Sequence, residues 1–265
     1  MIAVKEIKSK DNKLIKYIQR LNSSSSFRKK EKLFFCEGLR LCNDALKSGA
    51  IIKSAFFSSS AVEKYSGLLE DFDALKTDIY FIADGVFKLI AETQTPQGVA
   101  VLCEIPQTDK ADCSFKTAAA LERIQDPQNM GTILRSAEAF GIDCVVLSKD
   151  CCDIFSPKVL RGSMGAVFRQ KIIIPNDFCY AIEEMNNSGV KTYAAVPRSG
   201  GDVLDADFSA PACVIIGNEG NGLSERVIEL CRDKITINMN GNAESLNAAV
   251  ASSILMWEMI RGNDK

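Results

Sequence analysis

The sequence predicts an α/β protein with two domains, and three features lead to this prediction. Strand-like and helix-like apolar patterns alternate from residue 118 to the end, which is typical of a mostly parallel sheet covered by helices. A shorter alternation over the first hundred residues predicts a smaller α/β unit. A polar stretch separates the two, and 265 residues with 46% hydrophobic side chains can fill two cores. We therefore expect domains over residues 1–105 and 114–265, joined by a linker over 106–113.

The smaller domain is predicted to begin with an amphipathic helix. Apolar residues within 11–21 recur at helical spacing, and the serine run 23–26 interrupts the pattern. A strand-like segment, 33–36, is followed by Glu37-Gly38 and then by a helix over 39–47. Further strands are expected over 51–57, 79–82 and 98–103, and further helical patterns over 61–69 and 84–91.

The larger domain opens with a strand-like segment over 121–124, followed by a turn and a helix. The turn is Asp126-Pro127-Gln128-Asn129, and proline and asparagine both suit a helix start, with Asn129 a candidate cap. The helix is predicted over 132–140, because its apolar residues share one face and Gly141 follows.

Two polar loops late in the chain are predicted to form a ligand site. The apolar run 212–216 reads as a buried strand that leads into the glycine-rich turn 217–225. The second loop, 240–247, opens a long apolar helix running from Ser245 to about Ile260, which places Ser245 at the expected N-cap. Because both loops follow strands, they are placed to surround one small polar ligand.

The glycine spacing does not match the common nucleotide-binding fingerprints. Dinucleotide and P-loop folds carry their glycines after the first strand, as GxGxxG or GxxxxGK[ST]. Here Gly217, Gly220 and Gly222 follow the penultimate strand, with a different spacing. The three glycines, taken alone, are equally compatible with a turn that binds nothing.

Composition excludes several classes of site. The chain has no histidine, which removes Ser-His-Asp and Cys-His mechanisms and every zinc site that needs imidazole. Its ten cysteines are scattered and lack zinc spacing, so we expect reduced structural thiols and no metal. No apolar stretch approaches the roughly 20 residues of a membrane span, and the start lacks a signal-peptide pattern, so a cytoplasmic location is expected.

Positive charge is concentrated near the N-terminus, although the net charge of the whole chain is only −2. Residues 1–32 hold ten Lys or Arg against three acids, an asymmetry that indicates a polyanionic partner such as RNA. The alternative is a solvated helix face together with a mobile loop at the serine run 23–26. The candidate RNA contacts are Lys13, Arg20, Arg28, Lys29, Lys30 and Lys32.

Three segments together resemble the motifs of the SpoU (TrmH-type) RNA ribose methyltransferases of the SPOUT superfamily. The matching residues of the first are Pro127, Asn129, Gly131, Arg135, Ala137 and Gly141. Those of the second are Gly217, Asn218, Glu219, Gly220, Gly222, Leu223 and Ser224. Those of the third are Ile237, Met239, Gly241, Ser245, Leu246, Asn247 and Ala251. Order and spacing agree throughout, except that the family usually has proline where this chain has Asn238.

The resemblance implies a trefoil-knotted catalytic domain that forms a homodimer, preceded by a ribosomal-protein-like domain that binds the RNA substrate. It also implies S-adenosylmethionine as cofactor, and main-chain groups can read an adenine edge while apolar side chains cover its faces. The implied cofactor-binding residues are Val196, Gly217, Asn218, Gly220, Gly222, Ile237, Met239 and Leu246.

Arg135 is the implied catalytic residue, surrounded by Asn129, Glu219, Ser245 and Asn247. A ribose hydroxyl is a weak nucleophile, and a fixed guanidinium can orient it and stabilise its alkoxide character. Since arginine is a poor proton acceptor, we assign it orientation and charge stabilisation. The alternative is a surface arginine paired with Glu138 or Glu219, and Glu219 itself either holds Arg135 or closes its loop through backbone N–H groups.

These observations predict an S-adenosylmethionine-dependent 2′-O-ribose methyltransferase acting on structured RNA, with ribosomal RNA favoured by the accessory domain. Transfer RNA is the alternative substrate. A catalytically silent RNA-binding or ribosome-assembly protein is the rival from another class. The presence of all five polar residues, Arg135 and the four around it, favours the enzyme.

Overall fold

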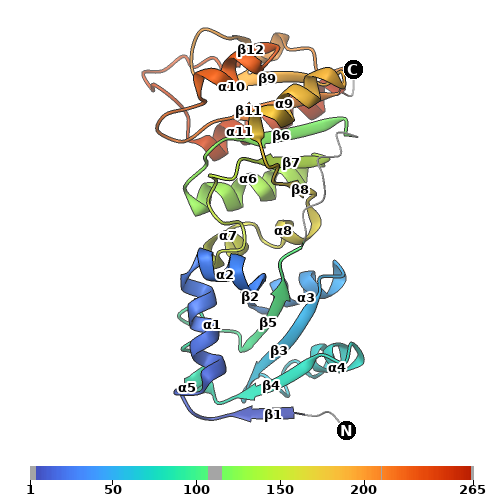
Figure 1. Ribbon diagram of the computed structural model, residues 1–265, viewed down its shortest axis with the longest axis vertical. Helices are drawn as coiled ribbons and strands as arrows, with labels where there is room; N and C mark the ends of the chain where they lie inside the picture. The colour runs from blue at the N-terminus through green and yellow to red at the C-terminus, as the bar shows by residue number, and fades with distance from the viewer. Residues whose placement is uncertain (1–3, 107–114, 210, 264–265) are drawn as a thin grey trace. The chain divides into compact units, whose positions relative to one another are not determined.

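The computed structural model describes residues 4–106, 115–209 and 211–263. Contacts divide the chain into two compact units, both of which are α/β as predicted (Figure 1). The first unit takes Met1–Gln107 together with Asp153–Phe168, and the second takes Thr108–Cys152 together with Arg169–Lys265. Of the predicted linker 106–113, only Pro106 falls within the described residues.

The first unit contains a five-stranded sheet of mixed direction, in the order β1-β4-β3-β5-β2. Strands β1, β4 and β3 are parallel, whereas β5 runs antiparallel to both of its neighbours. The strands are β1 (Val4–Ile7), β2 (Leu33–Glu37), β3 (Ile52–Ser58), β4 (Asp78–Ile82) and β5 (Val99–Glu104).

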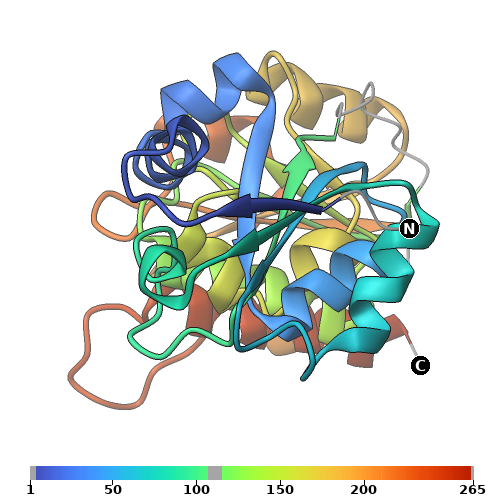
Figure 2. The same cartoon turned by 90° about the horizontal axis from the view of Figure 1, so that it is seen from below.

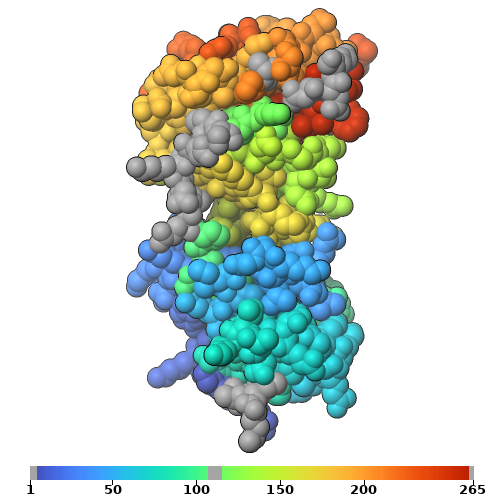
Figure 3. All heavy atoms as spheres, turned by 90° about the vertical axis from the view of Figure 1, so that its right-hand side faces the viewer, coloured from blue at the N-terminus to red at the C-terminus, as the bar shows by residue number. Residues whose placement is uncertain are grey.

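Helices cover both faces of this sheet (Figures 1 and 2). One face carries α1 (Lys13–Ser23), α2 (Ser25–Glu31) and α5 (Asp84–Phe87), and its core joins α1 to Phe56 of β3. The other carries α3 (Leu39–Lys47) and α4 (Ser66–Ala74), which form the surface turned to the viewer in Figure 3. There Phe57 packs on Phe72, with ring centroids 6.2 Å apart. Side chains that alternate along β3 thus supply both cores.

Three expectations for this unit were wrong in detail. The serine run is a helix junction and not a loop, because the Ser24 hydroxyl accepts a hydrogen bond from the Phe27 N–H at 3.2 Å and caps α2. The helix expected over 61–69 begins only at Ser66. The helix expected over 84–91 ends at Phe87, after which the Leu89 and Ile90 N–H groups bond carbonyls three residues back.

The second unit contains a seven-stranded sheet in which every pair of neighbours is parallel, in the order β10-β12-β9-β11-β6-β7-β8. The apolar strands β6, β7 and β11 are buried along their whole length, as expected of a sheet covered on both faces. The strands are β6 (Thr117–Leu121), β7 (Cys144–Leu147), β8 (Ile172–Ile173), β9 (Lys191–Ala195), β10 (Gly201–Asp202), β11 (Ala212–Ile216) and β12 (Asp233–Thr236).

Two pairs of helices cover the second sheet. Helix α6 (Pro127–Phe140) packs against α11 (Ala248–Asn263), and the hydroxyl oxygens of Ser136 and Ser253 lie 2.8 Å apart between them. Helix α9 (Phe178–Asn187) packs against α10 (Glu225–Leu230) over a separate core. A short 3-10 helix, η1 (Val203–Asp205), follows β10. No helix within the described ranges is both long and apolar enough to cross a membrane.

The segment 153–168 follows β7 in sequence but packs with the first unit. It carries α7 (Pro157–Gly162) and leads into α8 (Ala166–Arg169). Phe155 and Phe168 lie against Phe34, with ring centroids 4.5 and 6.0 Å away. The compact units therefore do not follow the linear division of the chain at this segment.

Arg28 holds the same segment through a buried ion pair. Its Nε lies 2.7 Å from an oxygen of Asp153, and only 4% and 11% of the two side chains is exposed. Its Nη1 also donates to the main-chain oxygens of Leu21 and Asn22. The expectation that Arg28 contacts RNA phosphate was therefore wrong, because its charge is already used inside the protein.

Removing the Arg28 guanidinium should destabilise the first unit, since it would leave the Asp153 carboxylate buried without a counter-charge, held only by the Phe155 N–H. We expect Arg28→Ala to lower the free energy of unfolding by about 3–5 kcal/mol. The exposed neighbour Lys29 supplies the control, because Lys29→Ala should change it by no more than about 0.5 kcal/mol. Urea denaturation of both variants measures the difference, and equal midpoints would show that the ion pair is dispensable.

Candidate active site

Four neighbouring strands of the second sheet send their following loops to one edge. Strands β12, β9, β11 and β6 are adjacent and parallel, so their carboxyl ends lie together. In open parallel sheets this edge is where ligands bind. The loops after these strands begin at Glu122, Val196, Gly217 and Ile237.

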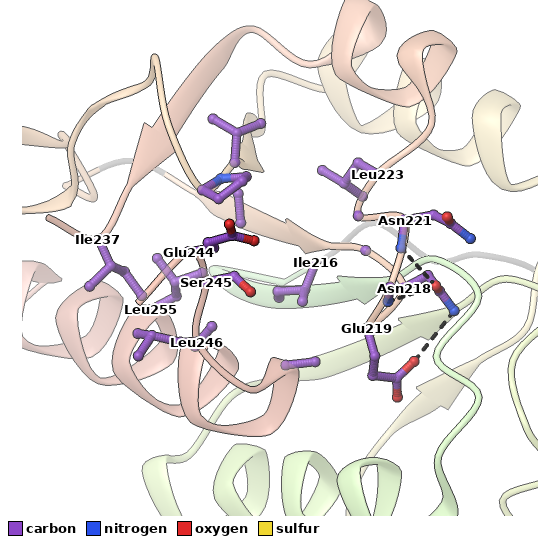
Figure 4. A pocket seen from close by; sticks show the side chains of 18 of the residues that line it. Ile216, Asn218, Glu219, Asn221, Leu223, Ile237, Glu244, Ser245, Leu246 and Leu255 are labelled. Atoms are coloured by element: carbon purple, nitrogen blue, oxygen red, sulfur yellow. Dashed lines mark hydrogen bonds between the residues drawn. The ribbon is translucent and has the colours of Figure 1, made fainter. Parts of the chain in front are cut away.

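A cavity of about 440 Å³ opens at this edge (Figure 4). All the residues predicted to bind the cofactor line it: Val196, Gly217, Asn218, Gly220, Gly222, Ile237, Met239 and Leu246. Its lining also includes Glu219 and Ser245 from the predicted catalytic set. Sequence reasoning missed Pro197, Ile216, Glu244 and Leu255. The position of Glu244 beside Ser245 was the one signal for it, and both side chains point into the space between the loops in Figure 4.

The glycine-rich loop folds back on itself in a tight reversal. Asn218 and Gly222 exchange two main-chain hydrogen bonds of 3.0 and 2.9 Å, and Gly222 adopts a positive φ of 65°. The Asn218 Oδ1 accepts bonds from the Gly220 and Asn221 N–H groups at 3.0 Å each. A Cβ on Gly217 would lie 2.2 Å from main-chain atoms of Gly222 and Leu223. Only glycine fits at 217, whereas at 220 the nearest atom would be 3.6 Å away.

Two further contacts fasten this loop to the end of β6. The Asn218 Nδ2 donates to the Arg123 main-chain oxygen at 2.8 Å. Ser224, which caps α10, donates its N–H and its hydroxyl to the two oxygens of Glu122, each at 2.8 Å. Glu122 is 8% exposed, so its carboxylate is satisfied by these donors and not by water.

Glu219 closes its loop onto the turn that precedes α6. Its carboxylate accepts from the Gln125 N–H at 3.2 Å, the Asp126 N–H at 3.1 Å and the Asn129 Nδ2 at 3.1 Å. Burial raises the pKa of Glu219, but the hydrogen bonds from Asn129 and from main-chain N–H groups together lower the pKa below its ordinary value. The contacts match the alternative in which Glu219 closes the loop.

Asn129 links Glu219 to the third motif. Its Oδ1 accepts from the Asn247 Nδ2 at 3.0 Å, so one amide side chain joins the loops after β6, β11 and β12. Asn129 does not cap α6. Asp126 does so, because its Oδ1 accepts from the Gln128 and Asn129 N–H groups at 2.8 Å each, which frees the Asn129 side chain.

Ser245 is not the N-cap of the last helix, contrary to the sequence prediction. Helix α11 begins at Ala248, and the Asn247 Oδ1 accepts from the Ala249 and Val250 N–H groups at 2.9 and 3.3 Å. Asparagine caps as well as serine does, and the later start leaves the exposed Ser245 on the wall of the cavity.

Arg135 is exposed on α6, about one turn beyond Gly131. Within the described residues, its guanidinium forms no ion pair and no hydrogen bond. Both partners that the alternative required are engaged elsewhere: Glu138 bonds Arg169 at 2.8 Å, and Glu219 bonds the turn before α6. The guanidinium is therefore available to an external anion or hydroxyl.

The remaining RNA candidates lie on the first unit. Lys13, Arg20, Lys29, Lys30 and Lys32 are all exposed on or beside α1 and α2. Arg20 lies over the Phe27 ring, 4.2 Å from its centroid. No group of three or more metal-ligating side chains is found within the described ranges.

The chain belongs to the SpoU rRNA Methylase family, whose sequence profile matches residues 116–257. Residues 12–101 match the MRM3-like substrate binding domain. The MRM3-like match covers most of the first unit, and the SpoU match covers most of the second unit.

Named relatives are similar over almost the whole chain. The 23S rRNA (guanosine(2553)-2'-O)-methyltransferase RlmP of Bacillus subtilis is 32% identical over 97% of this chain and 99% of its own. The mitochondrial rRNA methyltransferase 3 of Homo sapiens is 32% identical over 89% of this chain and 69% of its own. The AdoMet-bound rRNA methyltransferase from Sinorhizobium meliloti superimposes with a TM-score of 0.85 and 29% identity, over 97% of this chain and 98% of its own.

The glycine loop supplies a direct test of the cavity. Gly217→Ala should abolish ligand binding, because the new Cβ would collide with main-chain atoms that cannot move aside. Gly241→Ala is the control and should bind nearly normally, since a Cβ there would meet no atom within 4 Å and Gly241 does not line the cavity. Calorimetry with S-adenosylmethionine, alongside thermal unfolding of both variants, measures the effect. Equal affinity in the two variants would mean that the tight reversal is irrelevant to the site.

Proposed function

We propose that the protein is an S-adenosylmethionine-dependent RNA 2′-O-ribose methyltransferase that acts on ribosomal RNA. One observation carries the proposal: a ligand-sized cavity is bordered by a bonded cluster of Glu219, Asn129 and Asn247, and the helix that contains Asn129 also carries the unpaired Arg135. Membership in the family and the names of its relatives support the same chemistry and substrate class.

The cavity suits S-adenosylmethionine in size and in chemistry. Its volume falls within the roughly 300–1,000 Å³ typical of small-molecule sites. Ile216, Ile237 and Leu246 supply apolar walls for the adenine faces, and the glycine loop leaves main-chain groups accessible. The Glu244 carboxylate gives the wall a negative charge that favours a cationic ligand. When bound there, the cofactor would supply the electrophilic methyl group.

We assign Arg135 to the ribose. Its guanidinium would hold the 2′-hydroxyl or an adjacent phosphate and stabilise the charge that develops on the oxygen during transfer. Asn129, Glu219 and Asn247 would hold the start of α6 and the start of α11 in fixed relation. Ser245 would contact substrate or cofactor at the cavity wall.

We further propose the roles of the two domains, their location and their assembly. Residues 1–105 would bind RNA and 114–265 would catalyse transfer, in a trefoil-knotted domain and in the cytoplasm. A homodimer through the second domain would cover the apolar surface of α11, where Val250 and Trp257 are 49% and 51% exposed. Sedimentation at micromolar concentration tests the dimer.

Ribose-methylation mapping tests the function and the role of Arg135 together. Ribosomal RNA from cells that lack the protein should regain one 2′-O-methyl group on incubation with protein and S-adenosylmethionine. Arg135→Ala should slow single-turnover transfer by about 10²-fold or more, the scale for losing one preorganised donor, with cofactor affinity unchanged. Arg135→Lys should rescue little, because an ammonium lacks the planar fork. Absence of methylation by the unaltered protein would favour the silent RNA-binding alternative. Methylation of transfer RNA alone would show that the substrate is transfer RNA and not ribosomal RNA.

Salt dependence tests the RNA surface of the first unit. Changing Lys29, Lys30 and Lys32 together to glutamine should weaken RNA binding. Each lost phosphate contact should reduce the slope of log affinity against log salt by roughly 0.7 to 0.9. The control changes Lys47 and Lys64, exposed lysines outside that segment, to glutamine and should leave the slope intact. Identical slopes in the two proteins would make the N-terminal charge an ordinary solvated surface.

A further inference from the structure

The segment after β12 presents one side to the cavity and the other to a neighbouring turn. Ile235, Ile237 and Met239 line the cavity. The intervening residues, Thr236 and Asn238, make hydrogen bonds away from it. Side chains alternate in this way along extended backbone, and the alternation continues beyond Thr236, where β12 ends.

The partner of these intervening residues is the segment 196–202, which follows β9 with a turn and ends in β10. The Thr236 hydroxyl donates to the Val196 main-chain oxygen at 3.1 Å and accepts from the Gly200 N–H at 3.0 Å. The turn approaches so closely that a Cβ on Gly200 would lie 2.7 Å from the Thr236 hydroxyl oxygen.

Asn238 extends this attachment beyond the strand. Its Nδ2 donates to Asp202 at 2.5 Å, while the other oxygen of Asp202 caps η1 through the Leu204 N–H at 3.0 Å. Asp202 is therefore fixed by its own helix cap before it receives the Asn238 amide. Among the described residues, side-chain hydrogen bonds anchor the irregular segment 237–247 at two places, Asn238 near its start and Asn247 at its end.

We propose that Asn238 and Asp202 are positioning residues that hold the 237–239 wall of the cofactor site. The inference rests on the proposed function, since it concerns the same cavity. Neither side chain lines the cavity, so both act through Ile237 and Met239. The Asn238 bond restricts this stretch of backbone from the side that faces away from the cavity.

Removing the bond should weaken cofactor binding and spare the chemical step. Asn238→Ala should raise the dissociation constant and the KM for S-adenosylmethionine by roughly threefold to tenfold, the range expected for one partly exposed hydrogen bond. Turnover at saturating cofactor should stay unchanged. Asn240→Ala is the matched control, because Asn240 is an exposed asparagine of the same loop that does not line the cavity. Asn238→Pro should restore most of the affinity.

A reciprocal exchange separates the bond from general damage. Asn238→Asp should bind more weakly than Asn238→Ala, because it places two carboxylates side by side. Adding Asp202→Asn should rescue it: the amide introduced at 202 can donate to the carboxylate at 238 and still cap η1 through its oxygen. A merely disruptive substitution would not be rescued by a second one.

The outcomes separate the positioning role of Asn238 from the proposed function. If the unaltered protein binds no S-adenosylmethionine by calorimetry, the proposed function fails and the inference fails with it. If it binds, and Asn238→Ala binds with the affinity of Asn240→Ala, only the positioning role is overturned. Faster hydrogen exchange of the 237–239 amides in Asn238→Ala than in Asn240→Ala would support the role even before cofactor is added.

Discussion

The carboxylate of Glu219 is the contact on which the geometry of the site depends. It receives hydrogen bonds from the Gln125 and Asp126 N–H groups and from Asn129, and Asn129 in turn receives the Asn247 amide. A parallel sheet brings the loops after β6, β11 and β12 to one edge but does not fix their relative positions. The linked hydrogen bonds of Glu219, Asn129 and Asn247 fix these positions. They are therefore the link between the fold and the cavity.

The same contact has a definite dependence on pH. The pKa of Glu219 is lowered, because its hydrogen bonds outweigh the effect of burial, so the ionised form is the one that the structure stabilises. The stabilisation is present above the ordinary glutamate range and is lost as pH falls through the lowered pKa. At neutral pH the carboxylate remains an acceptor only, and it leaves Arg135 unpaired. Because the Glu219 carboxylate closes its loop, it forms no ion pair with the Arg135 guanidinium.

The local sequence identifies the basic residues near the N-terminus but does not show which of them are exposed. Arg28 stands among lysines that remain exposed, and nothing in its immediate neighbours distinguishes it from Lys29 or Lys30. Its burial depends on Asp153, more than a hundred residues later, and on Leu21 and Asn22 oxygens that converge with it. The return of 153–168 to the first unit was likewise beyond local pattern, because aromatic contacts with Phe34 require the assembled fold.

The sequence by itself determined the fold class, the family and the two loops that border the cavity, because apolar periodicity and the order and spacing of short motifs are encoded locally. Tertiary structure decided how the polar residues divide their tasks. Several side chains near each helix start can cap it, so Asp126 and Asn247, and not Asn129 and Ser245, were selected by where their neighbours lie. The Asn238–Asp202 bond is of the same kind, since its partners stand 36 residues apart. A hydrogen bond needs both partners in place, and only the folded chain brings them together.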